Sequence, residues 1–250
     1  MSETIVITAA THTELSLMLR SLGGRTVETA GGFPLWESDI AAGRIVMAVT
    51  GMGKINAAAA AAVLCERFRP ELIINTGCAG AFPESGLTVG DLALAGVEIA
   101  ADEGVLTSTG WLSYEGIGIA AVESQGRRYF NEFPLSPAVA RQALSLAVEL
   151  GDPLSCGTFL TVSTCSGTVA RGRELYERFG APLCENMEGA AVVQVALRYG
   201  VEALELRGVS NLVEERNLSR WNIPLAVERS QLFLLKFIAS RGKEYSICPT

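Results

Sequence analysis

The hydrophobic positions of the chain form two kinds of pattern that alternate along its length. Apolar runs of strand length lie at 4–9, 33–39, 44–49, 72–76, 90–100, 157–162 and 203–209. Stripes with apolar residues every three or four positions predict helices at 14–22, 57–68, 136–150, 188–199 and 224–240, and a further helix ends at 179. This alternation predicts an α/β fold with a central, mainly parallel (mixed) sheet and helices on both faces. We expect a single domain over 1–250.

Two carboxylates fall at predicted strand-to-helix crossovers, where α/β sheets bind ligands. Glu188 lies in the first turn of its predicted helix. Either it caps that helix, or its carboxylate accepts hydrogen bonds from two neighbouring hydroxyl groups of a ligand. Met187 beside it offers an apolar surface that suits a sugar ring. Glu14 repeats the arrangement at the start of an earlier helix, for which Thr13 is the expected N-cap.

Two stretches of small residues also follow predicted strands. Residues 51–56 form a glycine turn before a helix N-terminus, where backbone N–H groups can hold an anion, although the spacing of a Walker loop is absent. Residues 77–81 are all small, which lets either a ligand or the next element approach the backbone closely. The polar, aromatic-containing region 101–134 is typical of a functional or interface loop.

Composition narrows the classes of function. Hydrophobic residues make up 49% of the chain and the mean hydropathy is +0.30, as expected for a sheet buried on both faces. The net charge of -7 disfavours nucleic acid as a partner. No apolar run is long enough to span a bilayer and no positive leader precedes the first strand, so we expect a cytoplasmic protein without a membrane partner.

Metal binding and a Ser-His-Asp triad are disfavoured by the residue inventory. The chain has a single histidine, His12, which we interpret as a surface loop residue. Its six cysteines lack a CxxC pair or metal-ligand spacing, and we interpret them as reduced, buried thiols. They are Cys65, Cys78, Cys156, Cys165, Cys184 and Cys248. We expect no metal and no cofactor.

Four clusters occur in a characteristic order: 51–57 (GMGKINA), 76–80 (TGCAG), 186–191 (NMEGAA) and 207–211 (RGVSN). Together they resemble the nucleoside phosphorylase and nucleosidase superfamily over nearly the whole chain. The combination is specific, whereas no single cluster would be. The resemblance implies a nucleoside phosphorylase-like fold, a small-molecule nucleoside substrate and a homo-oligomer, with the aromatic region 111–133 as a candidate interface.

The resemblance also implies roles for matching residues. Glu188 would bind the ribose 2′- and 3′-hydroxyls, Met187 would pack on the sugar, and Glu14 would activate the attacking water. The segment 77–81 would lie near the anomeric carbon and the base. Other residues implied to contact the substrate are Cys78, Ala79, Gly80, Asn186, Arg207, Ser210, Arg216 and Trp221.

Two positions depart from relatives that cleave methylthioadenosine. Those relatives have an aspartate where this chain has Asn211, and a glutamate where it has Asn186. The amide of Asn211 can donate to O6 and accept from a protonated N7, so it favours a 6-oxopurine such as hypoxanthine over adenine. The hydroxyl-rich loop 163–168 also differs, and its base contacts are left unassigned.

Water is the expected nucleophile. N-glycoside cleavage passes through an oxocarbenium-like ribose, which a nearby carboxylate such as Glu188 stabilises. Related phosphorylases carry an arginine just before the small-residue segment, where this chain has Asn75 and Thr76. Arg216 and Arg220 either bind a carboxylate of the substrate or are solvated loop charges. A purine nucleoside phosphorylase, a methylthioadenosine/adenosylhomocysteine nucleosidase and a non-catalytic nucleoside-binding protein are the alternatives.

Overall fold

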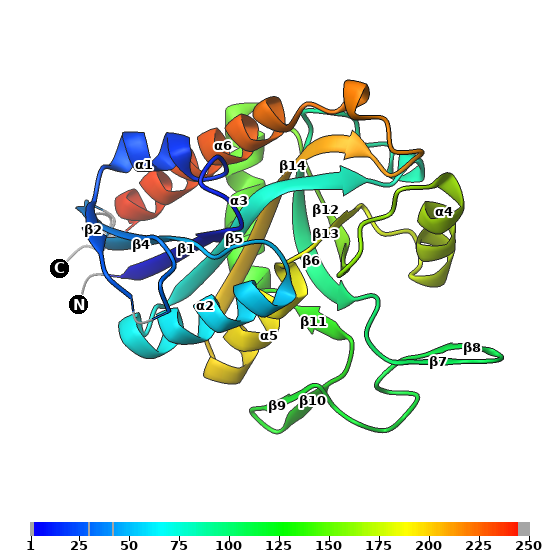
Figure 1. The fold of residues 1–250 in the computed structure, drawn as a ribbon. Coiled ribbons are helices and arrows are strands. Elements are labelled where there is room, and N and C mark those ends of the chain that lie inside the picture. Colours follow the sequence, from blue (N-terminus) through cyan, green and yellow to red (C-terminus); the bar gives the residue numbers. More distant parts are fainter. Residues whose placement is uncertain (1–2, 30, 42, 245–250) are drawn as a thin grey trace.

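A mixed sheet of ten strands forms the centre of the molecule, and helices cover both of its faces (Figure 1). The computed structural model describes residues 3–29, 31–41 and 43–244. The strands of this sheet are β1 (Thr4–Ala9), β2 (Arg25–Val27), β3 (Leu35–Ile40), β4 (Gly43–Val49), β5 (Leu72–Ala81), β6 (Leu92–Ala100), β11 (Glu132–Pro134), β12 (Leu154–Thr161), β13 (Cys184–Asn186) and β14 (Glu202–Leu212). The α-helices are α1 (Ser16–Leu22), α2 (Lys54–Phe68), α3 (Pro137–Leu150), α4 (Val169–Arg178), α5 (Gly189–Tyr199) and α6 (Ile223–Glu244).

Parallel pairing dominates the middle of the sheet. Strands β4, β1, β5 and β14 run parallel to one another in that order, and so do β6, β12 and β13. Strands β2, β3 and β11 pair antiparallel at the two ends. Because β14 also pairs with β6 and β13 also pairs with β5, the strands β5, β13, β12, β6 and β14 close into a ring. The predicted α/β architecture with a mixed sheet is confirmed.

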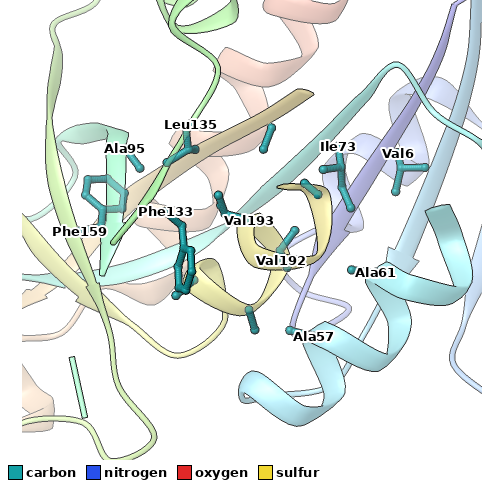
Figure 2. Packing of buried hydrophobic residues seen from close by; sticks show 14 of the residues in the cluster. Val6, Ala57, Ala61, Ile73, Ala95, Phe133, Leu135, Phe159, Val192 and Val193 are labelled. Atoms are coloured by element: carbon teal, nitrogen blue, oxygen red, sulfur yellow. The ribbon is translucent and has the colours of Figure 1, made fainter. Parts of the chain in front are cut away.

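Alternation along β1 separates the two layers of core. Ile5 and Ile7 belong to a cluster with apolar side chains of α1, α3 and α6 on one face. Val6 points to the opposite face, where it packs with α2 and α5 (Figure 2). There Ala57 and Ala61, four residues apart on α2, lie near Val192 of α5. Both faces of the sheet are thus buried, which explains why its strands appear as continuous apolar runs.

The small residues 77–81 do not form the loop that we expected. They continue strand β5, which pairs with β14 in parallel register as far as Ala81. Gly77 is required there because a Cβ atom would lie 2.3 Å from Glu14 Oε1 and 2.9 Å from Arg207 Nη1. Side chains of the protein itself therefore occupy the space beside this glycine.

Other predicted boundaries also need correction. Helix α1 begins at Ser16 with Leu15 at the N-cap, so Thr13 does not cap it and Glu14 lies in the preceding turn. The region 101–134 contains two hairpins, β7 (Val105–Thr107) with β8 (Gly110–Leu112) and β9 (Val122–Ser124) with β10 (Arg127–Tyr129), before β11 joins the sheet. Two short 3-10 helices lie at Pro83–Ser85 and Leu218–Arg220. Strand β2 was missed because it is short and two of its three residues, Arg25 and Thr26, are polar and exposed.

The expectation of buried thiols is only partly correct. Cys65 and Cys184 are buried and Cys78 is half-buried, but Cys156 and Cys165 are exposed. All five are free cysteines, and Cys248 lies outside the described residues. Within the described part of the chain, no helix is long and apolar enough to cross a membrane.

Candidate active site

A cavity of about 500 Å³ opens where strands β1, β5, β13 and β14 end. This is the edge of the sheet at which α/β proteins bind ligands, and the volume suits a small molecule. The residues that the sequence predicted for the site line this cavity, with the exceptions of Arg207 and Arg220. The lining adds Ala10, Thr11, Met52, Cys165, Ser166 and Glu185.

Three hydrogen-bond donors hold the carboxylate of Glu14. The backbone N–H and the hydroxyl of Thr11 both donate to Oε2, each at 2.9 Å, and the backbone N–H of Cys78 donates to Oε1 at 3.1 Å. The side chain is buried, yet it faces the cavity. An ionised carboxylate has about four acceptor positions, so one remains for a water molecule or a ligand hydroxyl.

The carboxylate of Glu188 does not cap its own helix. Glu188 stands at the N-cap of α5 rather than in the first turn, and its side chain makes no capping bond. Oε1 accepts from the backbone N–H of Gly53 at 2.9 Å, and Oε2 lies 3.5 Å from Arg207 Nη1. The turn before α2 is shorter than predicted, because residues 54–56 belong to the helix, and its Gly53 N–H holds an anion that is a side chain of the protein. Burial raises the pKa of Glu188, while Arg207 and the Gly53 N–H oppose the shift.

Asn186 performs the capping that was considered for Glu188. Its Oδ1 accepts from the backbone N–H groups of Glu188 at 2.9 Å and Gly189 at 2.7 Å. Its Nδ2 donates to Oε1 of Glu98 at 2.6 Å. Asn186 thus ties the backbone that carries Glu188 to the interior of the sheet.

Arg207 lies behind the cavity wall and does not line the cavity, which corrects the substrate contact that the resemblance implied. Its side chain is buried, and its Nε donates to Glu205 Oε1 at 2.8 Å. Nη1 donates to the carbonyl of Cys78 and Nη2 to Oδ1 of Asn186, both at 3.3 Å. Since Nη1 also faces Glu188, Arg207 supports the carboxylates of the site from within.

Two further carboxyl groups, which the sequence analysis missed, complete this buried network. Glu98 and Glu205 are both fully buried and crowd the same point: a Cβ atom on Gly189 would lie 2.1 Å from Glu98 Oε1 and 2.2 Å from Glu205 Oε2. Burial and the adjacent charge of Glu205 raise the pKa of Glu98 well above its ordinary value, so Glu98 holds a proton. Glu205 pairs with Arg207, whose Nε lies 2.8 Å from Oε1. Each of these two glutamates interrupts an apolar run of strand length, and this pattern is the feature of the sequence that could have revealed them.

A second polar group lies farther along the cavity, around Asn211. The Ser210 hydroxyl donates to Asn211 Oδ1 at 2.8 Å, and Asn211 Nδ2 donates to the carbonyl of Leu212 at 3.0 Å. Glu185 accepts from the backbone N–H of Ser166 at 2.8 Å and from its hydroxyl at 2.7 Å. The loop 163–168 therefore contributes to the cavity through a contact with Glu185 that the sequence did not reveal.

One arginine of the two candidates reaches the cavity. The guanidinium of Arg216 lies over the ring of Trp221, 4.8 Å from its centroid, and both residues line the cavity. Arg220 instead pairs with Glu214 at 2.9 Å and is absent from the lining.

His12 is exposed and packs edge-on against Trp36, as expected for a surface residue. Burial and the charge of Glu14 raise the pKa of Cys78 to about 12, so its thiol is neutral and a poor nucleophile.

Comparison of the sequence with known proteins shows the family to which the chain is related. The sequence model of the Phosphorylase superfamily matches residues 4–239. A futalosine hydrolase from Thermus thermophilus is 35% identical over 193 residues, which cover 77% of this chain and 80% of that protein. A 5′-methylthioadenosine/S-adenosylhomocysteine nucleosidase from Halalkalibacterium halodurans is 30% identical over 215 residues, covering 83% and 85%.

Solved structures agree on the fold. The 5′-methylthioadenosine/S-adenosylhomocysteine nucleosidase from Neisseria meningitidis, in complex with methylthio-immucillin-A, matches with a TM-score of 0.82 over 95% of this chain and 99% of that one, at 23% identity. The chain therefore belongs to the Phosphorylase superfamily. Within that superfamily it is an enzyme of the nucleosidase type, an N-glycosyl hydrolase.

Proposed function

We propose that this enzyme hydrolyses the N-glycosidic bond of futalosine, releasing hypoxanthine and dehypoxanthinyl futalosine, in the futalosine route of menaquinone biosynthesis. The stretch 205–213 together with Arg216 and Trp221 resembles futalosine hydrolase. The relative of that name from Thermus thermophilus supports this substrate. The observation that carries the proposal is the amide of Asn211 in the cavity wall, where relatives acting on methylthioadenosine have an aspartate.

The contacts of Asn211 leave both ends of its amide able to bind a base. Nδ2 carries two hydrogens, of which one donates to the Leu212 carbonyl. Oδ1 has two lone pairs, of which one accepts from Ser210. The remaining hydrogen suits O6 of hypoxanthine, and the remaining lone pair suits a protonated N7. Protonation of N7 from the solvent, as the bond between the anomeric carbon and N9 breaks, makes the base a better leaving group, and Glu14 returns to the solvent the proton that it takes from water.

The two carboxylates divide the chemistry at the sugar. Glu188 accepts hydrogen bonds from the ribose hydroxyls, and its charge stabilises the oxocarbenium-like transition state. Glu14 holds a water molecule with its free acceptor position and takes a proton from it as the water attacks the anomeric carbon. A general base so positioned contributes about 10²–10⁴-fold to the rate. Arg207 acts on the reaction only through Glu188, which it helps to keep ionised.

The positions of the cationic side chains favour water over phosphate as the nucleophile. Arg216 is the only cation among the described residues that line the cavity, and it lies with Trp221 beside the last loop. Asn75 and Thr76, which stand where related phosphorylases have an arginine, are buried and bond to β14. Futalosine carries a benzoate, and Arg216 is the residue that we assign to its carboxylate.

A panel of nucleosides tests the proposal. Base release from futalosine, inosine and methylthioadenosine is measured with and without phosphate. The proposal expects release of hypoxanthine from futalosine at a rate independent of phosphate. Cleavage of inosine that requires phosphate would identify a phosphorylase, preferred release of adenine from methylthioadenosine would identify the alternative nucleosidase, and tight binding without turnover would identify a nucleoside-binding protein.

The resemblance to the superfamily also leads us to propose a homo-oligomer. Apolar side chains at the start of α2 and in the hairpin β7–β8 are exposed, including Met52, Ile55 and Leu106. Met52 also lines the cavity, so an interface at this surface would partly cover the site. Light scattering of the purified protein measures the subunit number.

A further inference from the structure

A row of three residues crosses the wall of the cavity from strand to strand. Glu185 of β13 stands opposite Gly80 of β5, and Gly80 stands opposite Asn211 of β14. Directly opposed residues in neighbouring strands project to the same face of a sheet. All three residues line the cavity. Glu185 and Asn211 are therefore two polar side chains on one face, separated by a residue that has no side chain.

The gap at Gly80 lets the two polar side chains approach a common point. A Cβ atom at Gly80 would lie 3.1 Å from Asn211 Nδ2 and 3.7 Å from Glu185 Cγ. Neighbouring strands are about 4.8 Å apart, so the row spans about 10 Å between its outer backbones. This width matches the hydrogen-bonding edge of a purine placed between two side chains.

Glu185 is an acid that the protein leaves without an ion pair: burial raises its pKa, while the two Ser166 donors and the charge of Arg171 oppose the shift. Glu185 is buried, with 5% of its surface exposed, and its carboxylate oxygens accept hydrogen bonds from the backbone N–H and the hydroxyl of Ser166. No salt bridge to Glu185 occurs among the residues that the structure describes. The two Ser166 bonds use half of the acceptor positions of a carboxylate. A buried carboxylate with unused acceptor positions in a cavity wall is suited to a donor on the ligand.

We propose that Glu185 is a specificity-determining residue that accepts a hydrogen bond from N1–H of a 6-oxopurine. This inference rests on the proposed function and deepens it, because Asn211 is assigned to O6 and N7 of the same base. Hypoxanthine has a hydrogen on N1. Adenine has a lone pair there, which an ionised carboxylate opposes because it can only accept. Glu185 thus selects the base at a ring position that Asn211 does not contact.

Binding of free bases tests this assignment without requiring turnover. The affinities of hypoxanthine and adenine are measured by calorimetry for the wild type and for Glu185→Gln. The variant has nearly the same shape, and the Ser166 hydroxyl can accept from the new amide instead of donating, so the loop contact persists. A site built to pair with a ligand group discriminates strongly against an analogue that lacks it. We expect the preference for hypoxanthine over adenine to fall by about 10-fold or more in the variant.

Glu215→Gln is the matched control. Glu215 also accepts a backbone N–H at the end of this loop, from Val169 at 3.2 Å, but it does not line the cavity. This variant is expected to keep the wild-type preference. A Glu185→Gln preference within about twofold of the wild type would overturn the inference, as would a wild-type protein that binds adenine more tightly than hypoxanthine.

A second measurement needs no variant. 1-Methylhypoxanthine keeps O6 and N7 but lacks the hydrogen on N1, and we expect it to bind the wild type at least about 10-fold more weakly than hypoxanthine. Equal binding would overturn the inference even if Glu185→Gln fails to fold. Failure of the wild type to cleave futalosine, with the base preferences as expected, would reject the proposed substrate and leave the role of Glu185 standing.

Discussion

The two ends of the cavity are built differently. At the end that we propose binds the sugar (the sugar end), the carboxylates of Glu14 and Glu188 are fixed by backbone N–H groups from separate elements and by the buried Arg207. At the far end, Arg216 and Trp221 lie on the loop after β14 and contact each other. Reacting groups require precise positions, whereas recognition of a substrate tail tolerates adjustment. The comparison indicates that changes at the sugar end should impair the rate, and changes at the far end should impair binding.

The largest effect is expected from Glu14→Gln. An amide cannot take a proton from water, so kcat should fall by about 10²–10⁴-fold. Because the change nearly conserves shape, the variant should remain folded. Single-turnover rates and a thermal melt measure the two properties. A rate within tenfold of the wild type would show that Glu14 is not the general base.

The buried network beneath the sugar end should respond unequally to its two carboxyl groups. Glu205→Gln removes the nearer of the two ion-pair partners of the buried Arg207, since Glu188 lies farther away at 3.5 Å, and should lower the free energy of unfolding by about 3–5 kcal/mol. Glu98→Gln replaces a group that is already neutral and should cost about 1 kcal/mol. Urea unfolding compares the variants. Equal losses would contradict the assignment of the proton to Glu98.

The far end is tested by a pair of arginines. Arg216→Ala should raise KM for futalosine by about 10-fold, since a hydrogen bond to a charged group is worth about 1.5–3 kcal/mol, and should leave kcat nearly unchanged. Arg220→Ala is the control, because Arg220 pairs with Glu214 outside the cavity. Steady-state kinetics with futalosine and inosine separate the effects. A similar KM increase for inosine, which has no benzoate, would contradict the assignment.

The smallest expected effect is a displaced titration. Burial raises the pKa of Glu188 above the ordinary value of 4.5, although Arg207 lowers it and Glu14 and Glu205 add to the rise. Since the ionised form binds the ribose, the acid limb of kcat/KM should lie above pH 4.5. Stability changes with pH in the opposite direction to activity. Because the folded protein binds the proton of Glu188 more tightly than the unfolded chain does, the contribution of Glu188 to stability is greatest below pH 4.5 and declines as the pH rises through the pKa of the folded state. An acid limb at or below pH 4.5 would contradict the role of Glu188.

The sequence predicted the parts of this molecule that depend on local pattern. Apolar runs and helical stripes gave the alternating elements, and the two crossovers located Glu14 and Glu188. Contacts between distant segments were not predictable in this way. The sequence indicates that the glycine turn containing Gly53 can bind an anion, but only the fold shows that this anion is the carboxylate of Glu188.

Two residues illustrate the limit within the site itself. The resemblance implies that Arg207 contacts the substrate, yet β14 turns its side chain inward, towards Glu205. Glu185 directly precedes the cluster 186–191, but the sequence does not identify it as a site residue. Only its register against Gly80 shows that it faces the cavity next to Asn211. Strand alternation gives the face of a residue only after the partner strands are known.

In the proposed reaction, water positioned by Glu14 displaces hypoxanthine from futalosine. The most direct measurement is the rate of hypoxanthine release from futalosine by the purified enzyme in phosphate-free buffer, repeated with saturating phosphate. We expect many turnovers at the same rate in both buffers, with a free sugar as the second product. Release that requires phosphate and yields a sugar phosphate, or no release of hypoxanthine in either buffer, would contradict the proposed reaction.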